Sequence, residues 1–471
     1  MNKINNKEIN NKENNNNENN SKKMNKSNMK FYAVGGFNVV GKNMCALEVN
    51  GEVVIFDMGV DVSRMVSLEE EQLEYRNLKC EELWDRNIIP NDYMLRGKKV
   101  VGVVVSHGHL DHVSAIPKLA PKYDCPIIGT AYTMEVVKKV IKDIGPKDLL
   151  GKVRVANYGE RIELSSNITI ELLRVTHSIP QPSMILVYTP EGIAVIAYDY
   201  KLDNTPTFGQ KPDYKRLGEL SKEDVKLMVC ETVHIDDEER TPSEKVAQLM
   251  VADAIDRAYR ESSAVFISTF ASQVARLKSI IDANNSNSKK RTVVILGRSM
   301  KEYLGAAEFL GMIDMKECMI ASRGKEVEKL LAKVELSPES YLVICTGNQG
   351  EHNSILSRIA RKELSFRFTK EDQVIFSSTV IPTPTNVASR YVLERNLKNQ
   401  GVRILKNVHV SGHAMREDHR DLIRIVNPEY LIPCHGETER LASFASLAEE
   451  EGYVLGNTVF ILTDGRYVVL K

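Results

Sequence analysis

The sequence predicts an α/β fold. Short apolar runs rich in β-branched residues, each bounded by Gly, Asp or Asn, recur along the chain and are typical of buried strands. Segments with the period of an amphipathic helix, such as residues 131–144, lie between them. A chain of 471 residues, 42% of them hydrophobic, has room for about two or three domains. Strands that alternate with helices in this way predict sheets covered by helices.

The composition narrows the class of protein. No apolar run approaches the roughly 18 residues that a membrane helix needs, so a membrane protein is excluded. Basic and acidic residues both number 63, so any nucleic-acid binding must depend on a local patch. The seven Cys residues form no CxxC pair, which favours reduced thiols and a cytoplasmic location over a disulfide framework.

The first 28 residues differ from the rest. They contain 13 Asn and six Lys but few apolar residues, and such a composition cannot offset the entropy of ordering the chain. They also lack the apolar stretch of a signal peptide. We therefore expect residues 1–28 to form a disordered Asn/Lys-rich tail and the folded part to start near Met29.

The first folded block covers residues 29–240. Its apolar runs predict strands, and a charged segment at 67–99 is expected to be helical and exposed. Strands are predicted at residues 53–56, 100–105, 168–175, 193–198 and 225–230.

A second block, at residues 241–404, alternates strands and helices regularly, which predicts a parallel sheet. Thr241 or Ser243 is expected to cap its first helix. That helix carries an apolar face formed by Val246, Leu249, Met250 and Ala254. Strands are predicted at 264–268, 292–296, 341–345 and 374–377, with helices near 277–281 and 301–309.

The strongest functional signal is the segment Ser106-His107-Gly108-His109-Leu110-Asp111-His112, which directly follows the predicted strand at 100–105. It gathers three of the chain's ten His residues and an Asp at the end of a strand. Imidazole nitrogens and carboxylate oxygens suit Zn²⁺ or Mn²⁺. The sequence therefore favours a metal site over the alternative, a solvent-exposed His-rich turn.

Further metal ligands are available elsewhere in the chain. His177, Asp199 and His435 each directly follow a strand-like run. Each of them alone is typical of a turn. As a set at the carboxyl ends of strands, where α/β sheets commonly build their sites, they favour a site for two metal ions.

These motifs resemble those of the metallo-β-lactamase superfamily, which folds as an αββα sandwich. The motif HxHxDH after a strand carries the likeness, together with Asp57, His177, Asp199 and His435 in the same order. The block at 241–404 falls between the last two of these residues, and such an insertion resembles the β-CASP nucleases. Within them the chain is most similar to the ribonuclease J family, over nearly its whole folded length. Further matching segments lie at residues 35–36, 41–44, 176–180, 268–272, 297–300, 346–351, 409–413 and 435–437.

The resemblance implies a metallo-β-lactamase domain, made of residues 29–240 and 405–471, with a β-CASP domain inserted at 241–404. It also implies two bound metal ions, with Zn²⁺ as the first expectation and Mn²⁺ as the alternative. The implied ligands are His107, His109 and His177 for one ion, Asp111, His112 and His435 for the other, and Asp199 between the two, with Asp57 behind the ligands.

The resemblance implies a catalytic role for three residues. Asp199 would lie between two ions that lower the pKa of a bridging water. His413 matches the β-CASP histidine thought to protonate the leaving 3′ oxygen, and Glu231, where the family usually has Asp, would orient it. A structural hydrogen bond is the alternative role of His413, and a helix cap or an ion pair is that of Glu231.

Members of the family act as 5′ to 3′ exoribonucleases that prefer 5′-monophosphate ends, and some also cut internally. The resemblance therefore implies single-stranded RNA as the substrate, in RNA decay or maturation. The implied RNA contacts are Phe270, Ala271 and Ser272, then Arg298 and Ser299, and then His409, Val410, Ser411, Gly412 and His413. For Arg298 the alternative to an RNA contact is a surface ion pair.

The chain departs from the family pattern at some points. It stops 36 residues beyond His435, so we expect no C-terminal domain like that of the bacterial enzymes, and this shorter architecture resembles the archaeal branch. A homodimer would then need another interface. Tyr198 replaces the usual Gly before Asp199, and Gln181 replaces an Asp shortly after His177, which predicts a different site entrance.

The sequence alone leaves other functions open. A β-CASP endoribonuclease of the polyadenylation-factor type would share these motifs. A DNA-directed or thioesterase-like hydrolase is a further alternative, but simple thioesterases lack the long insertion and the His413 segment. A non-catalytic RNA-binding subunit is the remaining alternative, and the presence of every proposed ligand argues against it.

Overall fold

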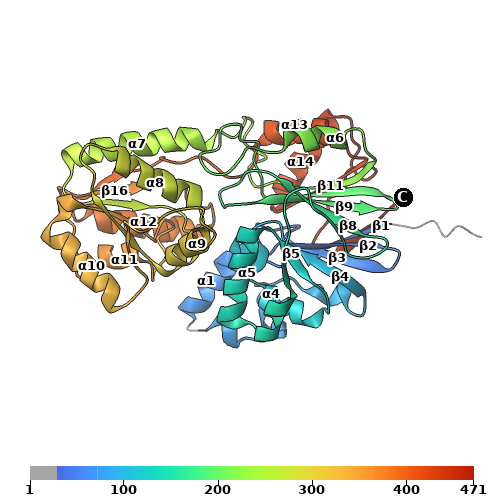
Figure 1. The fold of residues 1–471 in the computed structure, drawn as a ribbon, viewed down its shortest axis with the longest axis horizontal. Coiled ribbons are helices and arrows are strands. Elements are labelled where there is room, and N and C mark those ends of the chain that lie inside the picture. Colours follow the sequence, from blue (N-terminus) through green and yellow to red (C-terminus); the bar gives the residue numbers. More distant parts are fainter. Residues whose placement is uncertain (1–28, 72) are drawn as a thin grey trace, which may run out of the picture.

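The computed structural model of the chain describes residues 29–71 and 73–471. The tail that we predict to be disordered, at residues 1–28, lies outside the described residues. Among those described, no helix is long and apolar enough to cross a membrane. The chain forms two packed sheets with helices outside them, and a third sheet with its own helices lies beside this sandwich (Figure 1).

The first sheet has the strand order β19-β1-β2-β3-β4-β5-β6. Neighbours run antiparallel from β19 to β3 and parallel from β3 to β6. Because parallel strands end at the same edge, the residues after β3 and β4 lie close together. The strands are β1 (Met29–Gly35), β2 (Met44–Val49), β3 (Glu52–Phe56), β4 (Lys99–Val104), β5 (Ile127–Gly129), β6 (Val153–Val155) and β19 (Arg466–Leu470).

The second sheet has the strand order β18-β11-β10-β9-β8-β7. Its strands β10, β11 and β18 are parallel, so they also end at one edge. β18 comes from the end of the chain and reaches this place only after the third sheet has been completed. The strands are β7 (Arg161–Glu163), β8 (Thr169–Arg174), β9 (Ser183–Thr189), β10 (Gly192–Ala197), β11 (Val225–Glu231) and β18 (Tyr430–Cys434).

The two sheets face each other across a core to which both contribute, with Phe56 and Val104 on one side and Leu172 and Ile196 on the other. Helices cover both outer faces. This order of layers confirms the predicted αββα sandwich. On the first sheet lie α1 (Val62–Glu70), α2 (Cys80–Asp85), α3 (Leu110–Val113), α4 (Ile116–Leu119) and α5 (Ala131–Ile144), and on the second lie α6 (Tyr214–Leu220), α13 (Arg416–Val426) and α14 (Thr438–Glu450).

The third sheet, ordered β14-β13-β15-β12-β16-β17, is parallel throughout, as the sequence predicts. Helices α7, α8 and α9 cover one face, and α10, α11 and α12 cover the other. The predicted domain boundaries next to residues 241 and 404 stay predictions. The elements are α7 (Glu244–Glu261), β12 (Val265–Ser268), α8 (Val274–Ser286), β13 (Thr292–Leu296), α9 (Arg298–Phe309), β14 (Met319–Ala321), α10 (Lys325–Leu336), β15 (Tyr341–Cys345), α11 (Ile355–Ala360), β16 (Gln373–Phe376), α12 (Pro384–Lys398) and β17 (Arg403–Leu405).

The first helix of this unit, α7, begins as predicted, but the face that it buries agrees only in part with the predicted one. Ser243 is its cap, and the Ser243 side chain accepts a hydrogen bond from the backbone N–H of Lys245. The predicted apolar face is wrong in part: Ala254 is buried and Met250 packs against the core, but Val246 and Leu249 are 44% and 61% exposed. The helix packs on α8 through a face in which small residues allow close approach. That buried face contains Ala247, Val251, Ala254, Ile255, Ala258 and Tyr259.

The prediction for the charged segment at 67–99 is wrong in part. The helical part of its described residues consists of the end of α1, the helix α2 and two turns of 3₁₀ helix at Tyr75–Asn77 and Asp92–Leu95. Leu83 and Ile88 are buried in the helical layer of the first sheet. The segment therefore carries charged side chains together with apolar side chains, such as those of Leu83 and Ile88, that pack onto the first sheet.

Two connections join the third-sheet unit to the sandwich, one before α7 and one after β17. Arg276 of α8 lies between them and is 0% exposed. Its guanidinium donates to both carboxylate oxygens of Glu244, at 2.7 and 3.1 Å. It also donates to the carbonyl oxygen of Val408 at 3.1 Å and to the hydroxyl of Ser377 at 2.8 Å. One buried cation therefore holds both connections.

Replacing Arg276 by Met is expected to lower the free energy of unfolding by about 3–5 kcal/mol, because the Glu244 carboxylate stays buried without its partner. Arg257→Met is the matched control. Arg257 pairs with Asp253 on the exposed side of α7, so its loss is expected to cost at most about 1 kcal/mol. Urea unfolding followed by circular dichroism measures both variants, and equal changes would contradict the role of Arg276.

Candidate metal centre

The predicted ligands come together at one edge of the sandwich, where strands of both sheets end. His107 and His109 lie in the loop between β4 and α3, and Asp111 and His112 lie in α3 itself. The other ligands come from the second sheet, where His177 follows β8, Asp199 follows β10 and His435 follows β18.

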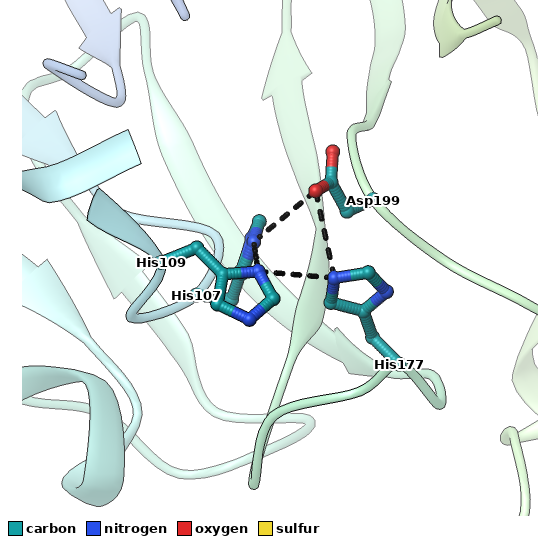
Figure 2. A group of neighbouring side chains, drawn as sticks. All are labelled: His107, His109, His177 and Asp199. Atoms are coloured by element: carbon teal, nitrogen blue, oxygen red, sulfur yellow. Dashed lines mark hydrogen bonds and ion pairs between the residues drawn. The ribbon is translucent and has the colours of Figure 1, made fainter. Parts of the chain in front are cut away.

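The first group of converging side chains consists of His107, His109, His177 and Asp199 (Figure 2). Nδ1 of His109 lies 3.0 Å from Nε2 of His107 and 3.1 Å from Nε2 of His177. The Oδ2 atom of Asp199 lies 3.4 Å from the His107 nitrogen and 3.5 Å from the His177 nitrogen. Ligand atoms held about 2.0–2.1 Å from a tetrahedral Zn²⁺ lie about 3.3–3.4 Å apart. The spacing of this group therefore suits a single ion.

The second group consists of Asp111, His112, Asp199 and His435. The Oδ1 atom of Asp199 lies 3.4 Å from Nε2 of His112 and 3.4 Å from Nδ1 of His435. Oδ2 of Asp111 lies 3.6 Å from Nε2 of each of the two histidines. One oxygen of Asp199 thus faces each group, and its carboxylate lies between them.

Buried atoms without partners support a metal cofactor. Within residues 29–71 and 73–471, Oδ1 of Asp199 and Nδ1 of His435 are buried and accept or donate no hydrogen bond. Buried polar atoms are rarely left in this way unless a bound group satisfies them. Imidazoles combined with carboxylates are a donor set for Zn²⁺ or Mn²⁺. The residues present therefore fit a metal cofactor.

Asp57 orients the metal ligand His112 through a hydrogen bond to its Nδ1 atom. It follows β3 in left-handed backbone, with φ of 56°. Its Oδ2 atom accepts hydrogen bonds from Nδ1 of His112 at 2.7 Å and from the hydroxyl of Ser106 at 2.6 Å, and its Oδ1 atom accepts from the backbone N–H of Ser106 at 2.7 Å. Because Nδ1 of His112 is the donor, Nε2 turns toward the second group, as is usual for metal-binding histidines.

Gly412 holds another ligand. Nδ1 of His177 donates to the carbonyl oxygen of Gly412 at 2.6 Å. A Cβ atom on residue 412 would lie 2.8 Å from Cβ of Ser178 and 3.1 Å from Nδ1 of His177, so a larger residue would push the two segments apart. The segment at 409–413 is thereby fixed against the first group.

Burial and local charge set the protonation of the ligands. Burial lowers the pKa of His109 and His177 well below its ordinary value, and neighbouring histidines add to this effect. Burial opposes ionisation of Asp199, but the surrounding imidazoles outweigh it and hold the pKa of Asp199 well below its usual range. Burial would also lower the pKa of His112, but nearby carboxylates raise it well above the ordinary value. Neutral imidazoles and ionised carboxylates bind metals, and the carboxylates near His112 favour a cation there.

His413 and Glu231 form a pair beside the two groups. Nδ1 of His413 lies 3.1 and 3.0 Å from the two carboxylate oxygens of Glu231, which is fully buried. Nε2 of His413 lies 3.9 Å from Oδ2 of Asp199. Burial would lower the pKa of His413, but Glu231 and Asp199 outweigh it and raise the pKa to about 9. The imidazole is thus held in one orientation, with Nε2 facing the metal groups.

The predicted RNA contacts near His413 lie along one segment. Residues 409–413 run past the first group, and the ring of His409 lies 6.1 Å from the ring of Phe270. Ala271 and Ser272, which follow Phe270, are partly exposed. The two segments therefore meet at Phe270 and His409, a proximity that the sequence could not show.

The two remaining predicted RNA contacts, Arg298 and Ser299, lie elsewhere, in a cavity of about 1030 Å³ that α5 and α9 help to line. Arg298 pairs with Asp143 at 2.9 Å and with Glu302 at 2.8 Å. These two carboxylates neutralise its guanidinium. Its contact with RNA stays a prediction.

The expectation that Tyr198 alters the site entrance is wrong. Tyr198 is 1% exposed, and its ring packs edge-on against His112 with the ring centres 5.3 Å apart. Tyr198 therefore packs against the metal ligand His112 and does not line the entrance of the site. Gln181, by contrast, lines a cavity of about 450 Å³ beside His177. Its Oε1 atom accepts a hydrogen bond from the backbone N–H of Tyr132 at the start of α5.

Asn43 is a polar residue at the second group that was not predicted from the sequence. Nδ2 of Asn43 lies 3.2 Å from the carbonyl oxygen of Asp111 and 3.0 Å from Nε2 of His112. Asn43 lies in the matching segment at 41–44, which was the available signal. Its amide therefore fixes the start of α3, where Asp111 and His112 lie.

Comparisons with known proteins agree with this architecture. Residues 38–190 match the metallo-beta-lactamase superfamily, and residues 262–394 match the family described as ribonuclease J, beta-CASP domain. Residues 402–462 match the Zn-dependent metallo-hydrolase RNA specificity domain. The fold is therefore a metallo-beta-lactamase domain with an inserted beta-CASP domain.

Similar proteins cover nearly the whole chain. Ribonuclease J of Pyrococcus abyssi is 46% identical over 93% of this chain and 97% of its own length. Ribonuclease J of Methanocaldococcus jannaschii is 42% identical over 93% of this chain and 98% of its own length. A crystal structure of an Enterococcus faecalis protein of unknown function is similar in fold, with a TM-score of 0.64 and 19% identity over 94% of this chain and all of that one.

Proposed function

Since the chain belongs to the ribonuclease J family and is a metal-dependent ribonuclease, we propose that it removes nucleotides from the 5′ end of single-stranded RNA and prefers a 5′-monophosphate. The observation that carries the proposal is the pair of ligand groups that share Asp199, with His413 beside them. Two groups and a nearby histidine supply what hydrolysis of a phosphodiester requires.

We assign one divalent cation to each group, Zn²⁺ in the first place and Mn²⁺ as the alternative. Two such cations, when bound, would supply a water of lowered pKa and would stabilise the negative charge that develops on the phosphate. In this assignment His107, His109 and His177 hold one cation, Asp111, His112 and His435 hold the other, and Asp199 is shared.

The protein's own residues orient the ligands and deliver the proton. Asp57 and Gly412 fix the rings of His112 and His177 through their Nδ1 atoms. Glu231 holds Nδ1 of His413, so that Nε2 donates the proton to the leaving 3′ oxygen. Proton delivery makes the 3′ oxygen a better leaving group.

Buried polar atoms without hydrogen-bond partners favour the binding of the RNA's 5′-end phosphate at loops of the third sheet. Side-chain atoms of Gln273, Asn348 and Ser378 are buried and have no hydrogen-bond partner among the described residues. They lie in the loops after β12, β15 and β16, which are neighbours in the parallel sheet. Amides and hydroxyls are common donors to phosphate oxygens. We propose that these loops receive the 5′-monophosphate while Phe270 to Ser272 and His409 to His413 line the path of the RNA.

Cleavage of RNA labelled at its 3′ end tests the direction and the end preference. The substrates carry either a 5′-monophosphate or a 5′-triphosphate and are incubated with the purified protein and Zn²⁺ or Mn²⁺. We expect a series of products that shorten from the 5′ end, formed about tenfold or more faster from the monophosphate, because charge-assisted hydrogen bonds to the end are lost or displaced in the triphosphate.

Internal cuts that do not depend on the 5′ end would contradict the proposal and favour an endoribonuclease of the polyadenylation-factor type. Absence of metal-dependent cleavage would contradict it as well. Gln273→Leu removes the amide and keeps the size of the side chain, so it is expected to lower the preference for the monophosphate without stopping cleavage. Two other predictions from the sequence, a homodimer and a cytoplasmic location, stay predictions.

A further inference from the structure

His234 lies at the site, outside the two ligand groups and the His413 pair, and has no role in the function proposed above. The ring of His234 lies 6.1 Å from the ring of His413, measured between centres. Its Nδ1 atom lies 2.7 Å from Oδ2 of Asp237, and its side chain is 36% exposed. His234 follows β11 by three residues, next to Met415, with which its backbone forms a bridge. Backbone and carboxylate therefore hold this imidazole at the edge of the site, where it meets solvent.

The contact with Asp237 decides which nitrogen of His234 carries the proton. A carboxylate only accepts hydrogen bonds, so Nδ1 is the donor and Nε2 of the neutral ring carries a lone pair. Burial, and then the neighbouring His413, lower the pKa of His234 below its ordinary value, which favours the neutral ring. Asp237 and Glu231 oppose this effect without reversing it. Nε2 thus offers an acceptor, and no residue within 29–71 and 73–471 bonds to it.

An acceptor at this place cannot bind a phosphate, whose oxygens are acceptors too. The backbone of RNA offers one donor of its own, the 2′-hydroxyl, which is also what distinguishes RNA from DNA. On the leaving nucleotide this hydroxyl is attached next to the 3′ oxygen. Two imidazoles with centres 6.1 Å apart can approach two adjacent oxygens, one each.

We propose that His234 accepts a hydrogen bond from the 2′-hydroxyl of the nucleotide on the 5′ side of the cleaved bond, and so makes the ribonuclease select ribose at that position. Asp237 is a positioning residue for His234. The inference rests on the proposed function, because it takes His413 as the proton donor to the neighbouring 3′ oxygen. It goes beyond that function, because it assigns sugar recognition to a residue outside the metal ligands and the His413 pair.

The test combines a change in the protein with a change in the substrate. Single-stranded RNA with a 5′-monophosphate is compared with the same RNA carrying 2′-deoxy or 2′-fluoro at the first nucleotide only. The 2′-fluoro sugar keeps the pucker of RNA but has no donor. We expect wild type to remove the first nucleotide about tenfold more slowly from both modified substrates, the value of one hydrogen bond.

His234→Phe is expected to slow the unmodified substrate about tenfold, to leave the modified ones nearly unchanged and to bring the ratio of rates close to one. Asp237→Asn is expected to reduce the ratio in part, because it weakens the hold on the ring. His352→Phe, at an exposed histidine in the third-sheet unit, is the matched control and keeps the wild-type ratio. Metal content and melting temperature of each variant check that the site and the fold are intact.

Two results would overturn the inference. One is a wild type that removes ribose and deoxyribose nucleotides equally fast, and the other is a His234→Phe variant that slows all substrates by the same factor. If the proposed 5′ to 3′ exonuclease function is wrong, the result is different, because cuts would then fall inside the RNA. In that case a single 2′-deoxy residue moved along the RNA gives the same test, read at the nucleotide before each cut.

Discussion

Changing Asp199 to asparagine is expected to lower kcat/KM for RNA by roughly a thousandfold or more, because metal stabilisation of the phosphate is worth several kcal/mol and each 1.36 kcal/mol is a factor of ten. Asp199 turns one oxygen to each ligand group, at 3.4 to 3.5 Å from the nearest imidazole nitrogens. An asparagine keeps the shape but offers only one oxygen. Its NH₂ group donates hydrogen bonds and cannot bind a cation.

Metal content gives an independent measurement of the same change. We expect mass spectrometry of the purified protein to find about two metal ions per chain in the wild type and one or fewer in Asp199→Asn. Asp124→Asn is the matched control, since the Asp124 side chain is fully exposed and pairs with Lys152, away from both ligand groups. Unchanged metal content together with normal cleavage in Asp199→Asn would contradict the shared ligand.

Much of the metal centre could be predicted from the sequence because it is local. His107 to His112 lie within six positions after one strand, so their proximity needs no knowledge of the fold. His177, Asp199 and His435 could be found because parallel strands place their carboxyl ends at one edge, which is a property of the architecture. The direction of each ring could not be predicted, because it depends on partners such as Asp57 and Gly412 that arrive from other segments.

Residues whose role depends on a distant contact could not be predicted from the sequence. Asn43 meets Asp111 across 68 positions, and His234 meets His413 only because the chain returns to the sandwich after the third sheet. The face of α7 was mispredicted in part for a related reason. The predicted face included Val246 and Leu249, whereas packing on α8 buries Ala247 and Val251 instead.

His413→Ala is expected to lower kcat for RNA cleavage by about 100- to 10,000-fold, the usual contribution of a positioned proton donor. Metal content is expected to stay close to that of the wild type, because His413 belongs to neither ligand group. Single-turnover cleavage of 5′-monophosphorylated RNA measures the change. A loss of bound metal or of folded protein in this variant would indicate the structural role instead.

Added imidazole separates proton donation from a structural role of His413. The side chain is 21% exposed, so its removal leaves a space that opens to solvent and that free imidazole can enter. Since Glu231 remains there to orient the added ring, we expect imidazole to restore part of the activity of His413→Ala in proportion to its concentration. In Glu231→Gln the space stays filled by His413, so the smaller loss of activity expected there should not respond to imidazole. If both variants respond equally, or neither responds, His413 is not the proton donor.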